Sequence, residues 1–436
     1  MRKIIDTAVI YQLFLRPFTN EGTLKAAEQM LPHIASIGTD IVYVCPMFVH
    51  DDDEDRAGWS ARQKKSALNN AKNPYRMKDY FHVDPEYGTD ADLKDFIDAA
   101  HALGMKVMLD LVYFHCGPNA VFLAEHPDFI ARTPDGTPAL GDWCFPKLNY
   151  ENPDLCEYMW SNMEYYVRDF GCDGYRCDVG DGVPIRFWRE GIRRIRAIKP
   201  DIVMLNEGTR KEFTTDNAFD LNYDFRFGWT MAEIMKSDKS AQVIADYRKN
   251  YREEHLTPGS RAVLFYDNHD ISCDQFEERH EKVLGFDAVN AMLFCCYTMD
   301  GVPFLYNGDE VADTHRHSIW GGRTTVGNLT IDWQNALTEK GQARLALVKT
   351  LAAFHKEHEA VACGEEIFLP LTSEAVVAYL RRTENETLLF AVSLKNREET
   401  VVIDDLTEDA VCILGGAEKN GKTLTMKPYS FAAYRL

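Results

Sequence analysis

Short apolar runs alternate with longer amphipathic stretches from the N-terminus to about residue 358. The first units are a strand over residues 8–15, a helix that ends at Gly38, and a second strand with the sequence DIVYVCPM. Glycine is a natural helix C-cap, because it adopts a left-handed conformation without strain. Alternation of this length is typical of a parallel sheet with helical crossovers, and the chain contains candidates for eight strand–helix units. The pattern predicts an α/β protein built on a closed (β/α)8 barrel, the TIM-barrel fold.

The pattern changes after about residue 358. Six short β-type runs follow, among them AVVAYLRR and TLLFAVSL, with turns rich in Asn, Glu, Gly and Lys between them. We therefore expect a barrel domain over residues 1–358 and a C-terminal antiparallel β-sandwich domain over residues 359–436. Two long loops are expected within the barrel, at 49–80 and at 115–153, and loops of this length are unusual unless they are functional. The second follows the third strand and is expected to form a small inserted domain.

Three of the apolar runs end on an acidic residue. The runs GYRCD, VMLNE and VLFYDNHD end at Asp178, Glu207 and Asp270. In a (β/α)8 barrel the carboxyl ends of the strands share one rim, where catalytic residues gather. Carboxylates that converge there suit glycosidic bond cleavage, which uses one as nucleophile and another as acid/base. Each of them taken alone would fit a structural ion pair better than catalysis.

Arg176 lies two residues before Asp178, and therefore on the same face of the strand. We expect its positive charge to lower the pKa of Asp178 and keep that carboxylate ionised. A retaining mechanism also needs a protonated partner, and burial near other acids is expected to raise the pKa of Glu207.

Composition narrows the class of protein. The chain has 436 residues, of which 45% are hydrophobic, and a formal net charge of −20, which argues against binding nucleic acid or an anionic membrane surface. It contains no run of 18 apolar residues that would cross a membrane, and its start lacks the apolar region of a secretory signal. The 11 cysteines include no CxxC pair, so we expect reduced thiols and a cytoplasmic location. The oligomeric state stays open.

The order of the motifs resembles the α-amylase superfamily, glycoside hydrolase family 13, over nearly the whole chain. VIYQLFLRPF resembles the first strand of that family, PKLNYENP the motif after its inserted domain, and GVPFLYNGDE its eighth strand. The resemblance implies a retaining α-glycoside hydrolase that acts on malto- or isomalto-type oligosaccharides through a covalent glycosyl-Asp intermediate. The alternatives are a transglycosylase or sugar isomerase of the same family, and a non-catalytic sugar-binding or transporter-accessory protein.

The resemblance also implies roles for single residues. It makes Asp178 the nucleophile, Glu207 the general acid/base and Asp270 the third carboxylate, which binds sugar hydroxyls. It implies further site residues, for substrate binding Tyr75, His115, Arg176 and His269, and for support of the site Asp110 and Asn149. For Asn149 a purely structural role in its loop is equally open.

Two features bear on metals. Many family members bind calcium through an Asn just before the first-motif His, but Phe114 occupies that position here and offers no oxygen. The acidic run 51–55 begins like an EF-hand loop, yet Arg56 and Arg62 stand where that loop needs Gly and Glu. We therefore expect a solvated loop, no calcium and no other cofactor.

Other positions bear on specificity. Asp181 and Gly182 stand where endo-acting amylases often carry Lys-His, which weakens the case for an endo-amylase of starch chains. Trp59, Trp143 and Trp320 lie in or near rim loops, where they would either stack on sugar rings or pack within the loops.

Overall fold

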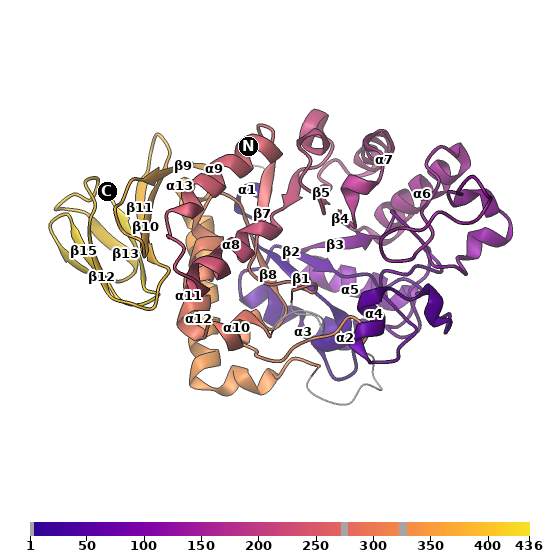
Figure 1. The fold of residues 1–436 in the computed structure, drawn as a ribbon, viewed down its shortest axis with the longest axis horizontal. Coiled ribbons are helices and arrows are strands. Elements are labelled where there is room, and N and C mark those ends of the chain that lie inside the picture. Colours follow the sequence, from indigo (N-terminus) through magenta and orange to yellow (C-terminus); the bar gives the residue numbers. More distant parts are fainter. Residues whose placement is uncertain (1–3, 272–277, 322–328) are drawn as a thin grey trace.

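The structure is a computed structural model that describes residues 4–271, 278–321 and 329–436. Within these ranges eight parallel strands form a closed barrel in sequence order, and β1 pairs with β8 to complete it. The predicted (β/α)8 fold is therefore confirmed (Figure 1). The barrel strands are β1 (Ile10–Leu13), β2 (Ile41–Val44), β3 (Lys106–Leu111), β4 (Gly174–Cys177), β5 (Val203–Asn206), β6 (Leu221–Tyr223), β7 (Arg261–Leu264) and β8 (Val302–Tyr306).

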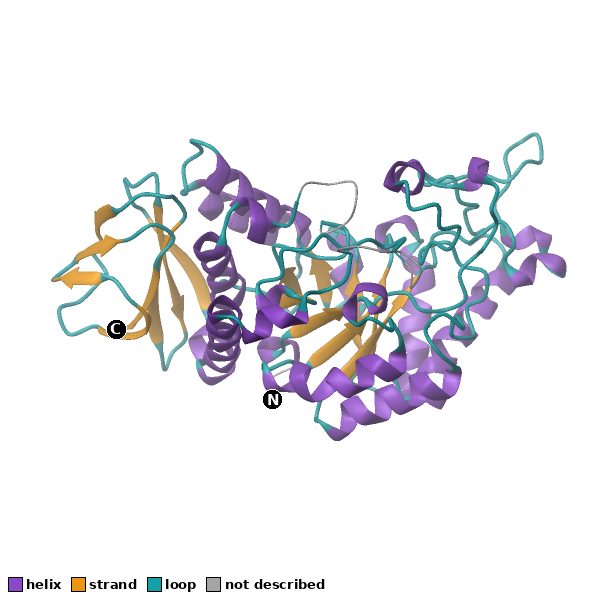
Figure 2. Ribbon diagram, turned by 90° about the horizontal axis from the view of Figure 1, so that it is seen from below, coloured by secondary structure: helices purple, strands orange, loops and turns teal. Residues whose placement is uncertain are grey.

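Helices surround the strands, as Figure 2 shows. Amphipathic sequence forms them, and local caps fix their ends: the helix at 90–102, for example, begins at a capping box between Thr89 and Asp92. The α-helices are α1 (Ile4–Thr7), α2 (Leu15–Phe18), α3 (Leu24–Ser36), α4 (Ala61–Ser66), α5 (Asp90–Ala102), α6 (Pro153–Tyr165), α7 (Ile185–Ile198), α8 (Phe225–Lys236), α9 (Val243–His255), α10 (His280–Val283), α11 (Phe286–Thr298), α12 (Glu339–Glu357) and α13 (Glu359–Cys363).

The barrel strands are mostly apolar on both faces because both faces are covered. Every residue of β4, β5 and β7 is buried. Side chains such as Tyr43, Leu205 and Phe304 fill the barrel interior, whereas the opposite faces pack against the helices. Such continuous apolar runs are typical of parallel strands enclosed by helices. In the described part of the chain, no helix is both long enough and apolar enough to span a lipid bilayer.

The segment between β3 and α6 forms an irregular insert at the barrel rim. It contains the 3-10 turns Val121–Ala124 and Pro127–Phe129 and isolated bridges, such as the one that joins His115 to Lys147. In Figures 1 and 2 it lies at the end of the molecule opposite the C-terminal sheets. The loop expected after the third strand is therefore a compact structure that contributes walls to the rim.

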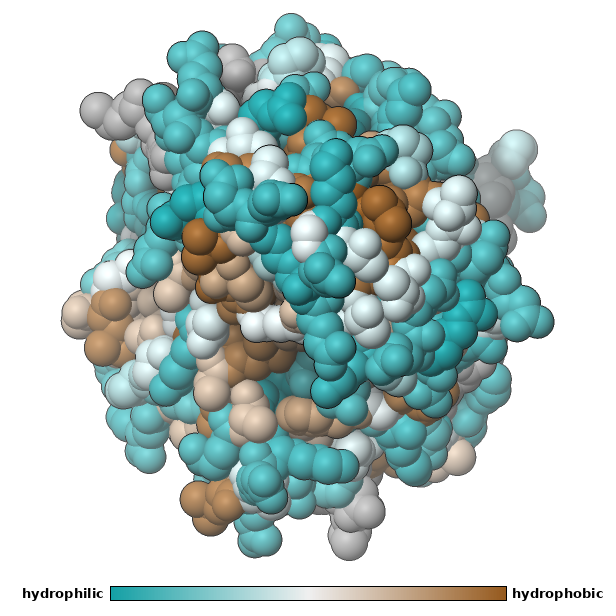
Figure 3. Space-filling model, turned by 90° about the vertical axis from the view of Figure 1, so that its left-hand side faces the viewer, coloured by the Kyte–Doolittle hydropathy of each residue, from teal (hydrophilic) through white to brown (hydrophobic). Residues whose placement is uncertain are grey.

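The C-terminal strands form two antiparallel sheets. The five-stranded sheet has the order β13-β16-β11-β10-β9 and the three-stranded sheet the order β12-β15-β14. Leu389, Leu424 and Tyr434 belong to one buried core shared by the two sheets. Seen from this domain, the surface is mostly hydrophilic with scattered apolar side chains (Figure 3). The strands are β9 (Glu365–Leu369), β10 (Val376–Arg382), β11 (Thr387–Ser393), β12 (Glu399–Val402), β13 (Val411–Gly415), β14 (Glu418–Asn420), β15 (Thr423–Met426) and β16 (Phe431–Arg435).

Apolar and charged contacts join the two parts. Phe294 of α11 stacks on Phe431 of β16, with ring centroids 4.5 Å apart. Beside this contact lies a set of ion pairs between the barrel and the C-terminal sheet. We call it the interdomain cluster, and its members are Arg252, Arg261, Asp300, Glu366 and Arg381.

Candidate active site

The three carboxylates that the sequence singles out lie at one rim of the barrel. Asp178 and Glu207 directly follow β4 and β5, and Asp270 follows β7 in the next loop. The backbone N–H of Asp178 still donates to Leu111 O at 2.9 Å, so the sheet fixes the position of this residue. Placement at the strand ends therefore fixes Asp178 and Glu207 on regular elements of the scaffold, which position a side chain more precisely than a loop does.

One guanidinium joins three of the site's acids. Arg176 Nη1 lies 2.9 and 3.0 Å from the two carboxylate oxygens of Asp110 and 2.8 Å from Asp178 Oδ1. Its Nη2 lies 2.5 Å from Glu207 Oε1. Asp110 and Arg176 are also register partners on β3 and β4. We call Asp110, Arg176, Asp178 and Glu207 the acid cluster.

His269 and Tyr75 connect the acid cluster to Asp270. The two rings stack with centroids 5.4 Å apart, and Tyr75 Oη lies 2.6 Å from His269 Nε2 and 3.4 Å from Asp110 Oδ2. His269 Nε2 lies 3.4 Å from Asp270 Oδ2. The Gln12 amide donates to His269 Nδ1 at 2.6 Å, so Nε2 carries the proton of the neutral ring. Gln12, which sequence reasoning missed, thus fixes the tautomer of a predicted site residue.

His115 lies against the insert. Its Nε2 is 2.8 Å from the carbonyl oxygen of Tyr75, and its ring contacts those of Trp143 and Phe145 at 5.6 and 4.9 Å. Burial lowers the pKa of His115 to about 4, so the ring is neutral at pH 7. Its buried Nδ1 has no hydrogen-bond partner among the residues that the structure describes, which leaves it available to a ligand.

Burial dominates the protonation of the acid cluster. It raises the pKa of Glu207 to about 8, an effect that Asp178 and Asp270 reinforce, and the pKa of Asp178 to about 7. The pKa of Asp110 also rises, to about 6, through burial. Arg176 opposes all three shifts without cancelling them. The expectation of a lowered pKa for Asp178 is therefore wrong, because the loss of hydration outweighs one arginine shared among three acids.

Asp270 behaves in the opposite way. Burial would raise its pKa, but His269 and Arg62 outweigh this effect and hold the pKa well below the usual range. Arg62 Nη1 lies 2.6 Å from Asp270 Oδ1, and its guanidinium lies 5.5 Å from the ring centroid of Trp320. Arg62 belongs to α4 in the long loop after β2, and no motif in the sequence pointed to this role.

The loop after Glu207 is held by the loop after Asp178. Glu207 Oε2 accepts a hydrogen bond from Val179 N at 2.8 Å. Val179 has φ 45° and ψ 42°, a left-handed conformation that strains a β-branched residue. Asp181 Oδ2 accepts from the backbone N–H groups of Thr209 and Arg210 at 2.9 and 3.1 Å. The residue that replaces the lysine of endo-acting amylases therefore anchors the segment that carries Glu207.

Asn149 stands apart from the acid cluster. Its side chain donates to the carbonyl oxygen of Asp128 at 3.1 Å and accepts from Glu151 N at 3.3 Å, both within the insert. The structure therefore gives Asn149 contacts that stabilise its own loop and brings it into none of the hydrogen bonds that join the other site residues.

Phe114 and the acidic run 51–55, which bear on metal binding, make other contacts. Phe114 packs on Trp143, and the Lys147 ammonium lies 5.5 Å from the centroid of its ring. The expectation of a solvated loop over 51–55 holds for Asp52, Glu54 and Asp55, which are exposed. It is wrong for Asp51, which is buried because its carboxylate accepts from Asn119 N at 2.7 Å and from the Arg76 guanidinium at 3.2 Å. No group of three or more His, Cys, Asp or Glu residues within the described ranges is placed to hold a metal ion.

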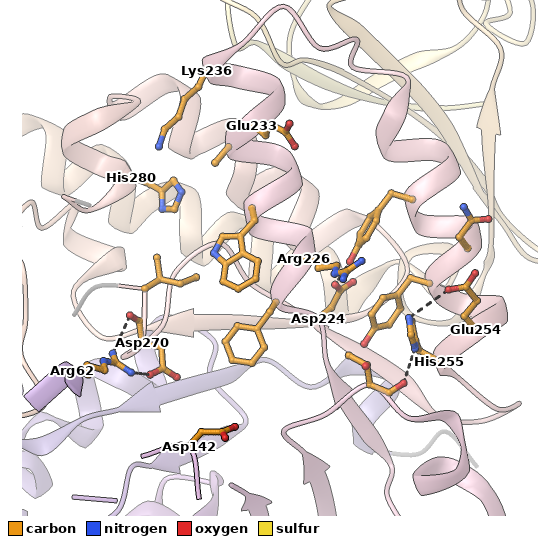
Figure 4. Close-up of a pocket in the computed structure, with 18 of the residues that line it drawn as sticks. Arg62, Asp142, Asp224, Arg226, Glu233, Lys236, Glu254, His255, Asp270 and His280 are labelled. Atoms are coloured by element: carbon orange, nitrogen blue, oxygen red, sulfur yellow. Dashed lines mark hydrogen bonds and ion pairs between the residues drawn. The ribbon is translucent and has the colours of Figure 1, made fainter. Parts of the chain in front are cut away.

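A cavity of about 1570 Å³ opens beside the site. Arg62 and Asp270 line it and point toward each other (Figure 4). From there it extends along α8 to the end of α9. Asp178 and Glu207 are not among its walls. Asp270 therefore marks the boundary between the nearly buried acid cluster and a space that can hold a larger ligand.

Known proteins are similar to this chain in sequence and in fold. A family model described as "Alpha amylase, catalytic domain" matches residues 10–133 and 140–355. A cyclomaltodextrinase from Bacillus sp is 26% identical over 446 residues, covering 89% of this chain and 73% of that protein. A maltogenic α-amylase from Bacillus acidopullulyticus is also 26% identical, over 94% of this chain and 70% of its own length. The structure of an α-amylase from Lactobacillus plantarum superposes with a TM-score of 0.81 at 24% identity, over 99% of each chain.

Proposed function

Since this chain belongs to the α-amylase family of glycoside hydrolases, we propose that it cleaves α-glucosidic bonds of short malto- or isomalto-type oligosaccharides with retention of configuration. The observation that carries the proposal is the acid cluster, in which one guanidinium contacts Asp178 at 2.8 Å and Glu207 at 2.5 Å. Two carboxylates on neighbouring nitrogens of one guanidinium lie close together, as in retaining enzymes, where the separation is about 5 Å. Inverting enzymes need a wider gap for a water molecule.

In the proposed mechanism Asp178 attacks the anomeric carbon while Glu207 protonates the departing glycosidic oxygen. Glu207 then removes a proton from water, and the hydroxide displaces Asp178 to release a sugar of unchanged anomeric configuration. The pKa values support this division, because Glu207 at about 8 retains its proton to higher pH than Asp178 at about 7. Between these values the state with Asp178 ionised and Glu207 protonated is the most populated one.

The remaining site residues would bind and orient the sugar. Tyr75, stacked on His269, presents a flat ring beside the acid cluster. His115 Nδ1 is a buried polar atom that a sugar hydroxyl would satisfy. Asp270, held ionised, would accept hydrogen bonds from further hydroxyls and favour the positive charge of the transition state.

We propose further that the enzyme needs no calcium and resides in the cytoplasm. Phe114 supports the first point, since it offers no oxygen ligand. The ten cysteines of the described residues, all unpaired, support the second, because reduced thiols persist in that compartment.

A product profile tests these proposals together. The protein is incubated with excess EDTA and maltotriose, isomaltose, panose or cyclodextrin, and products are followed by chromatography and their anomer by NMR. We expect α-anomeric glucose or short oligomers, and no products from Asp178→Asn. A β-anomeric product would contradict retention, and activity lost to EDTA and restored by Ca²⁺ would contradict calcium independence. Products longer than the substrate would indicate transfer of the intermediate to a sugar acceptor.

A further inference from the structure

Three aromatic rings lead outward from the acid cluster. The ring centroid of Tyr223 lies 5.8 Å from the Arg176 guanidinium and 5.1 Å from the ring of Phe225. Phe225 in turn stacks on Trp229, with centroids 5.8 Å apart and planes inclined by 27°. Tyr223 is buried, whereas Trp229 is 53% exposed. Among the described residues Trp229 is the one aromatic residue in the group of exposed large hydrophobic side chains. The exposed ring of Trp229 is therefore the outer end of a continuous row of aromatic rings that begins beside the acid cluster, and its face is open to a ligand.

The exposed ring faces the cavity that Asp270 borders. Phe225 and Trp229 both line it. In Figure 4 Asp270 lies toward one end and His255 toward the other, with Asp224 between them. A ligand that begins at Asp270 and extends along this cavity therefore meets α8 where the two aromatic residues stand one turn apart.

The protein holds this part of α8 rigidly. Asp224 caps the helix by accepting from Phe227 N at 3.1 Å, and it pairs with the buried Arg248 at 3.3 Å. Gly228 lies so close to the backbone of Tyr266 that a Cβ there would approach it to 2.7 Å. The buried face of α8 is made by other side chains, including Phe227, so the core does not require a tryptophan at 229. A flat apolar face on a fixed element is a pre-formed contact surface.

Polar groups surround the aromatic face. Charged side chains of both signs line the cavity, with three basic residues, Arg62, Arg226 and Lys236, and six acidic ones, Asp142, Asp224, Glu233, Glu254, Asp270 and Glu278. A neutral ligand with an apolar face and many hydroxyl groups matches this mixture, and a pyranose ring has this chemistry. The excess of acidic residues would repel an anionic ligand.

The cavity adjoins the loop that follows Glu207, the proposed general acid. Thr209, two residues after Glu207, lines it, and the carbonyl oxygen of Thr209 is 2.6 Å from His255 Nδ1 at the end of α9. A general acid stands beside the oxygen that leaves. We propose that Trp229, supported by Phe225, stacks on a sugar ring of the leaving-group part of the substrate. This inference rests on the proposed function and makes Trp229 a determinant of chain-length preference.

The test compares long and short substrates. For Trp229→Ala we expect kcat/KM to fall about tenfold on maltotetraose or maltopentaose and to stay within about twofold on the shortest substrate that is cleaved. Trp229→Phe keeps an aromatic face and should retain most of the activity on the long substrates. Leu337→Ala, which truncates an exposed apolar side chain outside the cavity, is the matched control and should change neither value. An equal loss on long and short substrates, or none on either, would overturn the proposal.

A binding measurement separates this proposal from the proposed function. Maltopentaose is titrated calorimetrically into Asp178→Asn and into Asp178→Asn/Trp229→Ala, with circular dichroism as a check on folding. We expect the dissociation constant to rise about tenfold in the double variant. If the wild-type protein cleaves nothing but this rise is seen, the hydrolytic function fails and the sugar site stands. If cleavage occurs and both dissociation constants agree, the site fails and the function stands.

Discussion

The two rims of the barrel carry clusters of charged side chains in which the ratio of acids to arginines is opposite. At the carboxyl ends of β3 to β5, three acids of the acid cluster share one guanidinium. At the other rim, Arg261 is the first residue of β7 and Asp300 lies two residues before β8. Both belong to the interdomain cluster. There Asp300 alone lies 2.8 Å from Arg261, 3.4 Å from Arg381 and 3.6 Å from Arg252. One rim has an excess of acids and the other an excess of arginines.

This balance decides the charge of a carboxylate that is wholly or partly withdrawn from water. Burial raises the pKa on both rims, but the arginines around Asp300 outweigh it and hold that pKa well below the usual range, whereas Arg176 leaves Asp178 at about 7 and Glu207 at about 8. A carboxylate that is charged at every physiological pH stabilises the fold, and one that exchanges its proton near neutrality can perform catalysis. This matches the division of labour in (β/α)8 barrels between a catalytic and a stabilising rim.

Asp178→Asn should produce the largest effect. We expect kcat to fall at least about 10⁴-fold, because an amide is not a nucleophile. Folding raises the pKa of Asp178, so the stability that this group contributes is present below its unfolded pKa of about 3.9 and lost as pH rises through about 7. The variant should therefore be more stable than wild type at pH 8 by about 1 kcal/mol, measured by urea unfolding. If the variant were only as stable as wild type at pH 8, or less stable, the ionised Asp178 would not destabilise the fold, and the contrast with Asp300 would be wrong.

Asp300→Asn should lower the stability of the fold and leave catalysis unchanged. The loss of its charge leaves the buried Arg381 and Arg261 with less compensation, and we expect a cost of about 2 kcal/mol in unfolding free energy. Because Asp300 is 29% exposed, this is less than for a fully buried pair.

Its pH dependence also has a defined sign. Folding lowers the pKa of Asp300, so its contribution is present above the unfolded value and lost as pH falls below about 4. The difference between wild type and Asp300→Asn should therefore shrink in acid, while kcat at pH 7 stays unchanged. Asp98→Asn, at an exposed ion pair, is the control and should cost less than about 0.5 kcal/mol.

The pH profile of the wild-type enzyme sharpens the comparison at the catalytic rim. We expect kcat/KM to rise as Asp178 ionises near pH 7 and to fall as Glu207 loses its proton near pH 8. Asp110 is one cause of the raised pKa of Asp178, so Asp110→Asn should move the acid limb to lower pH. An unchanged acid limb would mean that another group controls it.

Local pattern was enough to predict the barrel and the position of the carboxylates. A buried parallel strand is a continuous apolar run, and an acid at its end must lie at the rim. The positions of Asp178 and Glu207 therefore follow directly from the strand pattern. The balance of charge was not predictable, because it depends on burial and on partners far apart in sequence. Arg176 could be recognised from its place two residues before Asp178, but its effect on the pKa of Asp178 was overestimated. The pairing of Arg62 with Asp270 could not be predicted, because Arg62 lies 208 residues away in a loop without periodicity.

Arg62 and Asp270 form one pair at the catalytic rim in which, as around Asp300, an arginine keeps the carboxylate charged. Of the substitutions at the two rims, Arg62→Gln should have the smallest effect. Loss of this guanidinium should raise the pKa of Asp270, since Arg62 lowers it now. We expect kcat/KM to fall about threefold at pH 7 and further at lower pH, where Asp270 would begin to bind a proton. Arg62→Lys keeps the charge and should restore part of the loss. A gain in kcat/KM would instead mean that Arg62 competes with substrate hydroxyls for Asp270. The pair would then open when sugar binds, unlike the ion pairs around Asp300, which do not contact substrate.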